Sequence, residues 1–244
     1  MRISPRQKQI LSILNERVFI TVQELAELTF TSASSIRRDL TYLQNNGLVK
    51  RLHGGVSTVP PVSNVASFYD RAHKNTKEKR AIAQKAAGLL KDGQTVLLDS
   101  STTVTFLLPH IAKHRNITLF TNNLTTAIQA IELGITTHCL GGCAVNGSTA
   151  LSGPETFSAL SNIMADVLFF SSQSLDRQGR ISDTTQAENY ARKVMLQAAK
   201  TTVFLCDGAK FNSQSTYQLC NISQVDYAVF DVPYPDLIAN FNTL

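Results

Sequence analysis

The stretch "SASSIRRDLTYLQNNGLVKRLHGG", residues 32–55, has the pattern of a capped amphipathic helix followed by a short basic segment. Ser32 suits the N-cap, because its side-chain oxygen can accept a hydrogen bond from an unpaired amide of the first turn. Three apolar residues recur at a spacing that places them on one helix face: Ile36, Leu40 and Leu43. Gly47 ends the helix where left-handed backbone is least costly. We therefore expect a helix over about residues 33–46.

The opposite face of this helix is polar and positively charged. At about 100° per residue, the residues on or beside that face are Ser34, Ser35, Arg37, Arg38 and Thr41. Arginine suits contact with double-stranded DNA, because its planar guanidinium can bond guanine or a phosphate in two places. The alternative is a solvated helix face on which Asp39 pairs with a neighbouring arginine.

The next segment, "LVKRLHGGVSTV" (residues 48–59), alternates apolar and polar residues on either side of a Gly-Gly pair. This pattern predicts a small two-stranded hairpin. Its basic residues, Lys50, Arg51 and His53, are expected to lie near DNA phosphates or a minor groove.

Two further helices are expected before residue 32. The first covers about residues 5–17 and places Ile10, Ile13 and Leu14 on one face. Thr21 and Glu24 form a capping box that starts the second, shorter helix. Helix, short helix, turn, helix and hairpin make a winged helix-turn-helix over residues 3–58, with the helix-turn-helix itself at about 20–39. The third helix has the size that a DNA major groove admits.

The charge distribution favours the same partner. The net charge is +5, and residues 1–59 carry +4 of it. A basic excess confined to one segment indicates contact with a polyanion. No apolar run approaches 18 residues and no signal peptide is evident, so we expect a cytoplasmic protein without membrane contact. The four cysteines lack zinc-type spacing, and no metal site is expected.

Residues 59–75, which include a Pro-Pro pair, are expected to form a linker. Over residues 76–244, short apolar runs alternate with helical patterns. The expected strands are 95–99, 117–121, 135–140, 167–172, 202–207 and 227–230. This alternation predicts an α/β domain with a doubly wound, mainly parallel sheet.

Polar residues follow several of these expected strands. Ligands of such sheets bind beyond the carboxyl ends of the strands. The candidate ligand-binding residues at those ends are Asp99, Ser100, Ser101, Thr102, Thr103, Thr121, Asn122, Gly141, Gly142 and Lys210. Hydroxyls and amides at a helix start favour an anion, with Lys210 adding a positive charge. Each residue also has an ordinary structural reading, as an N-cap, a turn or a surface lysine.

The N-terminal residues resemble the DNA-binding domain of the DeoR family of bacterial regulators of sugar metabolism. The resemblance rests on "RQKQILSIL", "VQELAEL" and the spacing S-x-x-S-I-R-R-D-L-x-x-L-x-x-x-G-L-V-x-R-x-H-G-G. Ser35 stands where the family usually has threonine, and it keeps the hydroxyl.

The remainder resembles the family's effector domain through "LLDSSTT", "TNNLTTA", "LGG", "SGPE" and "DGAKF". That resemblance implies a fold similar to ribose-5-phosphate isomerase and a phosphorylated sugar as effector. Ser101 replaces the family's usual glycine, which adds a side chain where the backbone approaches a phosphate. Gly208-Ala209 stands where a small hydroxyl residue often precedes the lysine.

The expected function is that of a sequence-specific transcriptional regulator, namely a repressor of a carbohydrate-metabolism operon that a phosphorylated sugar releases. Its expected partners are operator DNA, the sugar phosphate and further copies of the chain, and no cofactor is expected. Activation of transcription is one alternative. The other is an isomerase-like enzyme with a DNA-binding appendage, for which Asp99, Glu188 or Asp207 would be the base.

Overall fold

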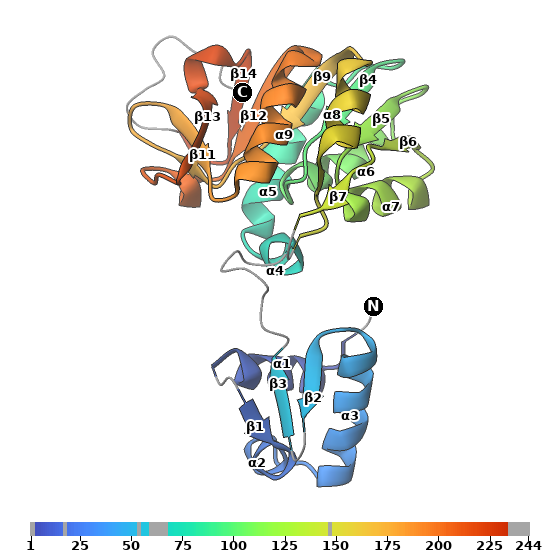
Figure 1. Cartoon of the computed structure of the whole chain (residues 1–244), viewed down its shortest axis with the longest axis vertical. Coiled ribbons are helices and arrows are strands. Elements are labelled where there is room, and N and C mark those ends of the chain that lie inside the picture. Colours follow the sequence, from blue (N-terminus) through green and yellow to red (C-terminus); the bar gives the residue numbers. More distant parts are fainter. Residues whose placement is uncertain (1–2, 17–18, 53–54, 59–67, 146–147, 234–244) are drawn as a thin grey trace. The chain divides into compact units, whose positions relative to one another are not determined.

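The computed structural model describes residues 3–16, 19–52, 55–58, 68–145 and 148–233. The chain forms two compact units that divide between Val62 and Ser63 (Figure 1). Part of the expected linker is not a linker: Phe68–His73 forms helix α4. The buried side chain of Phe68 anchors this helix. Residues 59–67 lie outside the described residues.

The first unit is a winged helix-turn-helix, as predicted. Its elements are α1 (Pro5–Glu16), β1 (Phe19–Thr21), α2 (Val22–Leu28), α3 (Ala33–Asn45), β2 (Val49–Leu52) and β3 (Gly55–Thr58). The hairpin of β2 and β3 gains a third strand, β1, which pairs antiparallel with β3. The sequence did not predict β1, because its three residues are too short a run to show a strand pattern.

One core holds this unit together, and the predicted apolar faces of all three helices contribute to it. Its buried side chains are Ile10, Leu14, Ile20, Leu25, Ile36, Leu40, Leu43, Val49 and Val56. The capping box of α2 is present, since the amide of Glu24 donates to Thr21 Oγ1 (3.2 Å) and the amide of Thr21 donates to Glu24 Oε2 (2.8 Å). Ser32 caps α3 by accepting from the amide of Ser35 (3.3 Å).

The second unit is built on a six-stranded parallel sheet in the order β14-β12-β9-β4-β5-β6. The strands are β4 (Thr95–Leu98), β5 (Thr118–Thr121), β6 (Thr136–Cys139), β9 (Ala165–Phe170), β12 (Ala199–Cys206) and β14 (Tyr227–Phe230). All six predicted strands are present. Because the chain first builds outward from β4 to β6 and then returns to β9, the topological switch point lies between β4 and β9.

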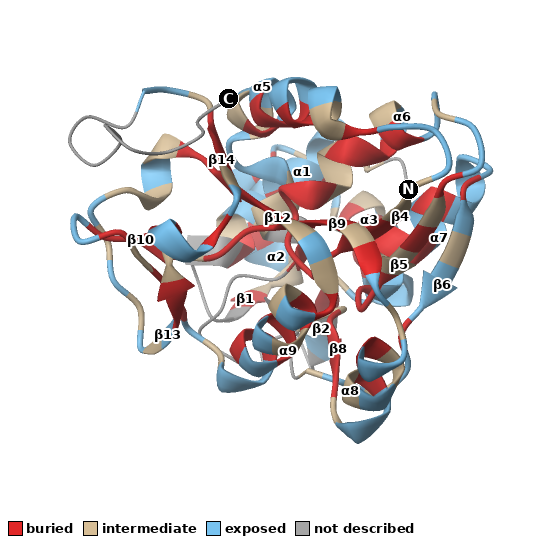
Figure 2. Ribbon diagram, turned by 90° about the horizontal axis from the view of Figure 1, so that it is seen from above, coloured by how far each residue is buried: buried red, intermediate tan, exposed pale blue. Residues whose placement is uncertain are grey.

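Helices cover both faces of this sheet, which confirms the doubly wound α/β architecture. They are α5 (Thr76–Ala86), α6 (Leu108–Ile111), α7 (Leu124–Glu132), α8 (Pro154–Ser161) and α9 (Gln186–Gln197). Buried residues of α5, α6 and α7 join one core and those of α8 and α9 the other. Figure 2 shows α5 and α6 on one side of the sheet and α8 and α9 on the other.

Smaller elements surround the sheet. The short 3-10 helices are η1 (Ala87–Leu89), η2 (Val104–Leu107), η3 (Gly208–Lys210) and η4 (Ile222–Gln224). The additional strands are β7 (Cys143–Ala144), β8 (Leu151–Ser152), β10 (Ser174–Leu175), β11 (Arg180–Asp183) and β13 (Tyr217–Asn221). β7 pairs with β8, and β10, β11 and β13 form an antiparallel sheet. Within the described part of the chain, none of the helices is long and apolar enough to span a membrane.

Candidate functional site

The outer face of α3 presents the predicted DNA-binding side chains to solvent. Arg37, Arg38 and Thr41 are exposed, as is Ser34, and Ser35 is half-buried. Arg38 Nη2 donates to Ser35 Oγ (3.3 Å), which holds this arginine along the outer face of the helix. These side chains therefore form one polar, cationic surface.

The wing contributes to the same surface. Arg51 on β2 is exposed, and its Nη1 donates to Thr41 Oγ1 at 3.4 Å. The structure thus brings a wing arginine to α3, although ten residues separate the two positions. Lys50 lies in β2, but its side chain is outside the described residues, as is all of His53.

Asp39 is buried and points away from that surface, into the interior of the unit. It accepts hydrogen bonds from Arg6 Nε (2.5 Å) and Gln7 Nε2 (3.1 Å), both on α1. The hydrogen bond and the charge of Asp39 raise the pKa of Arg6. The alternative in which Asp39 pairs with a neighbouring arginine of its own helix is therefore wrong, and Asp39 instead ties α1 to α3.

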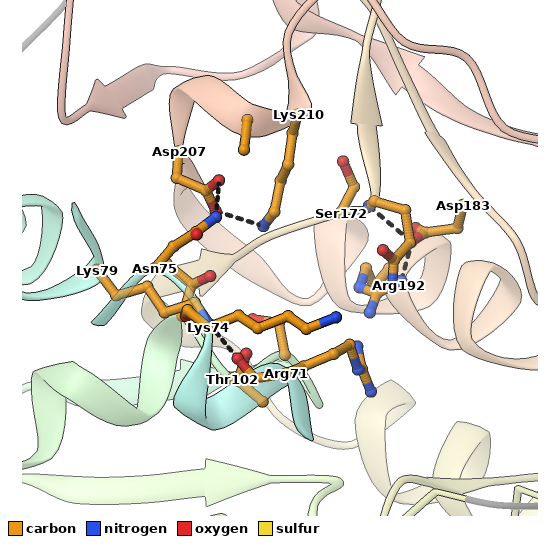
Figure 3. A pocket seen from close by; sticks show the side chains of 14 residues that line it. Arg71, Lys74, Asn75, Lys79, Thr102, Ser172, Asp183, Arg192, Asp207 and Lys210 are labelled. Atoms are coloured by element: carbon orange, nitrogen blue, oxygen red, sulfur yellow. Dashed lines mark hydrogen bonds and ion pairs between the residues drawn. The ribbon is translucent and has the colours of Figure 1, made fainter. Parts of the chain in front are cut away.

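The second unit contains a cavity of about 220 Å³ at the switch point between β4 and β9 (Figure 3). Its lining comes from the ends of four strands, β4, β9, β11 and β12, from α9 and from the segment of α4 and α5. The lining residues are Arg71, Lys74, Asn75, Lys79, Ser101, Thr102, Thr103, Ser172, Gln173, Asp183, Arg192, Asp207, Ala209 and Lys210. Five of these side chains are cationic and two are carboxylates. Arg192 and Asp183 pair with each other, which leaves Arg71, Lys74, Lys79 and Lys210 with one lining carboxylate, Asp207, so this part of the cavity favours an anion.

Four predicted ligand-binding residues line this cavity: Ser101, Thr102, Thr103 and Lys210. Lys210 Nζ donates to Ser171 Oγ (2.9 Å) and lies 3.4 Å from Asp207 Oδ2. The hydroxyl oxygen of Thr103 is buried without a hydrogen-bond partner among the described residues, so a ligand could supply one. Ser101, the departure from the family pattern, donates its hydroxyl to Asp99 Oδ1 (2.6 Å).

The other six predicted residues are outside the cavity lining: Asp99, Ser100, Thr121, Asn122, Gly141 and Gly142. Asn122 Nδ2 donates to the carbonyl of Leu151 (2.8 Å) and so holds the β7–β8 hairpin. Gly142 has φ +122°, and a Cβ there would lie 2.3 Å from Thr156 Oγ1, which makes it a packing glycine. β5 and β6 lie beyond β4, on the side away from β9, so the ends of these strands do not reach the cavity.

Arg192 of α9 is the centre of a buried ionic cluster beside the cavity. Its side chain is 3% exposed, and it donates to Asp99 Oδ2 (2.5 Å) and Asp183 Oδ2 (2.6 Å). Glu188 Oε2 lies 3.9 Å from its Nη2. Burial raises the pKa of Asp183 in spite of the charge of Arg192. Burial by itself would lower the pKa of Arg192. The negative charges of Asp183 and Asp99 outweigh the effect of burial, so the pKa of Arg192 is raised.

This cluster changes the interpretation of the carboxylates that an isomerase would need. Asp99 and Glu188 lie against Arg192, and Asp207 accepts a hydrogen bond from Asn75 Nδ2 (3.1 Å) besides its contact with Lys210. Each of the three carboxylates therefore already has a cationic or amide partner in the structure.

Lys79 is a functional candidate that the sequence analysis missed. It is 4% exposed, and its Nζ donates to the carbonyls of Arg71 and Lys74 (2.7 Å for the latter). Burial, and then the charge of Lys210, lowers its pKa to about 8. The available signal was its spacing, because it shares the buried stripe of α5 with Ile82, Ala83 and Ala86. Arg71 and Lys74 were missed because they lie in the expected linker.

The geometry defines a winged helix-turn-helix with a cationic outer face and a separate α/β domain with a cavity at the switch point of its sheet. Two family models match the chain: the DeoR-like helix-turn-helix domain over residues 6–61 and the DeoR C terminal sensor domain over residues 74–232. The chain belongs to the DeoR family. It is a DNA-binding transcriptional regulator of this family.

Curated relatives align with this chain over nearly its whole length. The HTH-type transcriptional regulator GolR of Listeria innocua is 30% identical over 93% of this chain and 89% of its own. The HTH-type transcriptional repressor CsqR of Escherichia coli is 29% identical over 91% of this chain and 85% of its own. Among solved structures, ribose 5-phosphate isomerase A of Methanocaldococcus jannaschii aligns with a TM-score of 0.43 and 14% identity, over 57% of this chain and 55% of that one.

We predict that Arg38→Ala weakens DNA binding by about 1–3 kcal/mol, because a bidentate arginine contact contributes about that much. The measurement is fluorescence anisotropy with a duplex selected from random sequence by the wild-type protein, at several salt concentrations. Arg115→Ala is the matched control, since Arg115 is 87% exposed in the second unit. Equal affinities of Arg38→Ala and wild type at every salt concentration would contradict the assignment of this face.

We further predict that Arg192→Met lowers the free energy of unfolding by about 3–5 kcal/mol, because it leaves buried carboxylates without their cation. Urea denaturation followed by circular dichroism measures the loss. Lys193→Met, on the same helix but exposed, should change stability by less than about 0.5 kcal/mol. Similar losses in the two variants would show that the ionic cluster does not stabilise the fold.

Proposed function

We propose that this regulator represses a carbohydrate-use operon and leaves its operator when a phosphorylated sugar binds the cavity between β4 and β9. The observation that carries the proposal is the charge of that cavity, which combines five cationic side chains with hydroxyls and two carboxylates. The relatives CsqR and AccR are named repressors, which supports repression, whereas one relative is named an L-fucose operon activator.

The distribution of groups in the cavity suits the two parts of such a ligand. In Figure 3 the side chains of Arg71, Lys74 and Lys210 extend into the cavity, and Asp183 and Arg192 lie at another side of it. The cations and the hydroxyl of Thr103 would hold a phosphate. Asp183 would accept hydrogen bonds from sugar hydroxyls, and the side-chain amide of Gln173 would donate to them or accept from them. About 220 Å³ is below the roughly 300–1,000 Å³ of sites for drug-sized ligands, so the ligand is a small metabolite.

The same contacts offer a route from the ligand to the DNA-binding unit. Arg71 belongs to α4 and Lys74 follows it, and α4 is the first described element after the segment that joins the two units. Lys79 holds this segment through the carbonyls of Arg71 and Lys74, and Asn75 bonds it to Asp207. A phosphate that binds Arg71 and Lys74 would therefore change the position or the mobility of α4. DNA release then follows as a shift between two populations.

A screen of pentose and hexose phosphates tests the ligand class, with the unphosphorylated sugars and inorganic phosphate as comparisons. A ligand at one hundred times its Kd stabilises the folded protein by about 2.7 kcal/mol, which raises the Tm in a thermal-shift assay. We expect at least one sugar phosphate to do so and to release the selected duplex, while its unphosphorylated sugar does neither.

In Lys210→Ala the Tm increase and the DNA release should both be lost, whereas DNA binding without ligand stays as in wild type. Lys113→Ala is the control, because Lys113 is exposed and does not line the cavity. A sugar phosphate that stabilises Lys210→Ala as strongly as wild type would remove Lys210 from the site. If none of the phosphates stabilises the wild type, the proposed ligand class is wrong.

We also predict that the affinity for the sugar phosphate falls as the pH is raised from 7.5 to 9.5. The pKa of Lys79 is about 8, so above this pH the unliganded cavity loses a positive charge, and anion binding must take up a proton. The charged groups that act on Lys79 are Lys210, Asp207, Arg71 and Glu78. Isothermal titration calorimetry in buffers of different ionisation enthalpy measures both the affinity and the proton uptake.

Lys79→Met should bind more weakly at pH 7.5 and show a flatter profile between pH 7.5 and 9.5. Lys79→Arg, which stays charged throughout this range, should also show a flat profile but bind more tightly than Lys79→Met. If both variants keep the wild-type pH dependence, another group is responsible and Lys79 does not contribute to the potential in the cavity.

A further inference from the structure

Helix α7 exposes an apolar stripe that the core of its own unit does not use. Leu124, Ile128 and Ile131 are 43%, 59% and 62% exposed, and Leu133, just past the helix, is 46% exposed. The first three are spaced by four and three residues, so they share one face of the helix. The buried residues that pack on the sheet, Thr126, Ala127 and Ala130, lie about 120° round the helix from this stripe. The stripe is therefore an outward face of α7.

The strand after α7 lies at an edge of the sheet. Among the described strands, β6 pairs only with β5, which leaves the outer backbone edge of Thr136–Cys139 without a partner strand. Edge strands are usually protected by lysine, proline or a bulge. β6 reads Thr-Thr-His-Cys and contains neither lysine nor proline. Its outer edge is thus suited to pairing with another strand.

The charge of this region selects the partner. From Ile117 to Val145 the sequence contains one residue among Asp, Glu, Lys and Arg, namely Glu132. A surface without cations does not fit a nucleic acid, and one without a charge pattern does not fit a charged peptide. In a two-fold contact the same surface of each copy meets the other, so a surface with charges of one sign would repel its own copy and an uncharged surface would not. A strand edge is also complementary to its own copy, because it carries both donors and acceptors.

We propose that α7 and β6 form the interface with a second copy of this chain. The β6 edges pair antiparallel about a two-fold axis, which continues the six-stranded sheet across the axis, and the apolar stripes of the two α7 helices pack against each other. This inference does not depend on the identity of the effector. It supplies the second winged helix that a two-fold symmetric operator requires.

Ile128→Glu tests the interface, because Ile128 is already 59% exposed and glutamate there can remain solvated in a folded monomer. Gln129→Glu is the matched control. It adds the same charge to the same helix at an exposed position about 100° round from Ile128, off the apolar stripe. Sedimentation velocity over a hundredfold range of concentration gives the mass of each protein. Circular dichroism and the Tm establish that each variant is folded.

We expect wild type and Gln129→Glu to sediment with at least twice the mass of one 26.7 kDa chain, and Ile128→Glu to dissociate at concentrations where they do not. A monomeric wild type, or a folded Ile128→Glu that keeps the wild-type mass, would overturn the proposal. Hydrogen–deuterium exchange tests the strand pairing separately. Amides of β6 should exchange faster in Ile128→Glu than in wild type at equal concentration, and equal exchange would refute pairing of the β6 edges.

Discussion

The ion pairs of the buried guanidinium of Arg192 are the contacts on which the second unit depends. The guanidinium joins Asp99 at the end of β4 to Asp183 at the end of β11, and Glu188 on its own helix adds a third carboxylate. A buried charge without its partner is very costly, so the two strand ends and α9 must keep these positions relative to one another. Because β4 borders the switch point, these ion pairs also shape one wall of the cavity, and two of their members, Asp183 and Arg192, line it.

A smaller contact of the same kind organises the DNA-binding unit. Asp39 is buried on the inner face of α3 and bonds Arg6 and Gln7 of α1. This pairing fixes the rotation of α3, so the outer face presents Arg37 and Arg38 to solvent. In both units, then, a buried carboxylate is bonded by an arginine distant in sequence, and this contact fixes an element beside a surface or cavity that carries further cationic side chains.

Much of the fold and part of the site could be predicted from the residues. The apolar spacing of Ile36, Leu40 and Leu43, the capping box at Thr21 and the six apolar runs all correspond to elements of the structure. These signals are local, since periodicity and caps depend on residues within one or two turns. Lys79 shows where such reasoning stops. Its position in a buried stripe was visible, but its partners, the carbonyls of Arg71 and Lys74, lie in a segment that carried no helical signal.

The amino-acid order by itself determined where strands end and which polar residues follow them, and it placed arginines opposite an apolar helix face. Only the tertiary structure decided which of those strand ends meet. The sheet order puts the ends of β4, β9 and β12 around one cavity, whereas those of β5 and β6 lie beyond β4. Strand order depends on contacts between residues far apart in the chain, so no local pattern could place Lys210 and Thr103 around the same cavity while excluding Asn122 and Gly142.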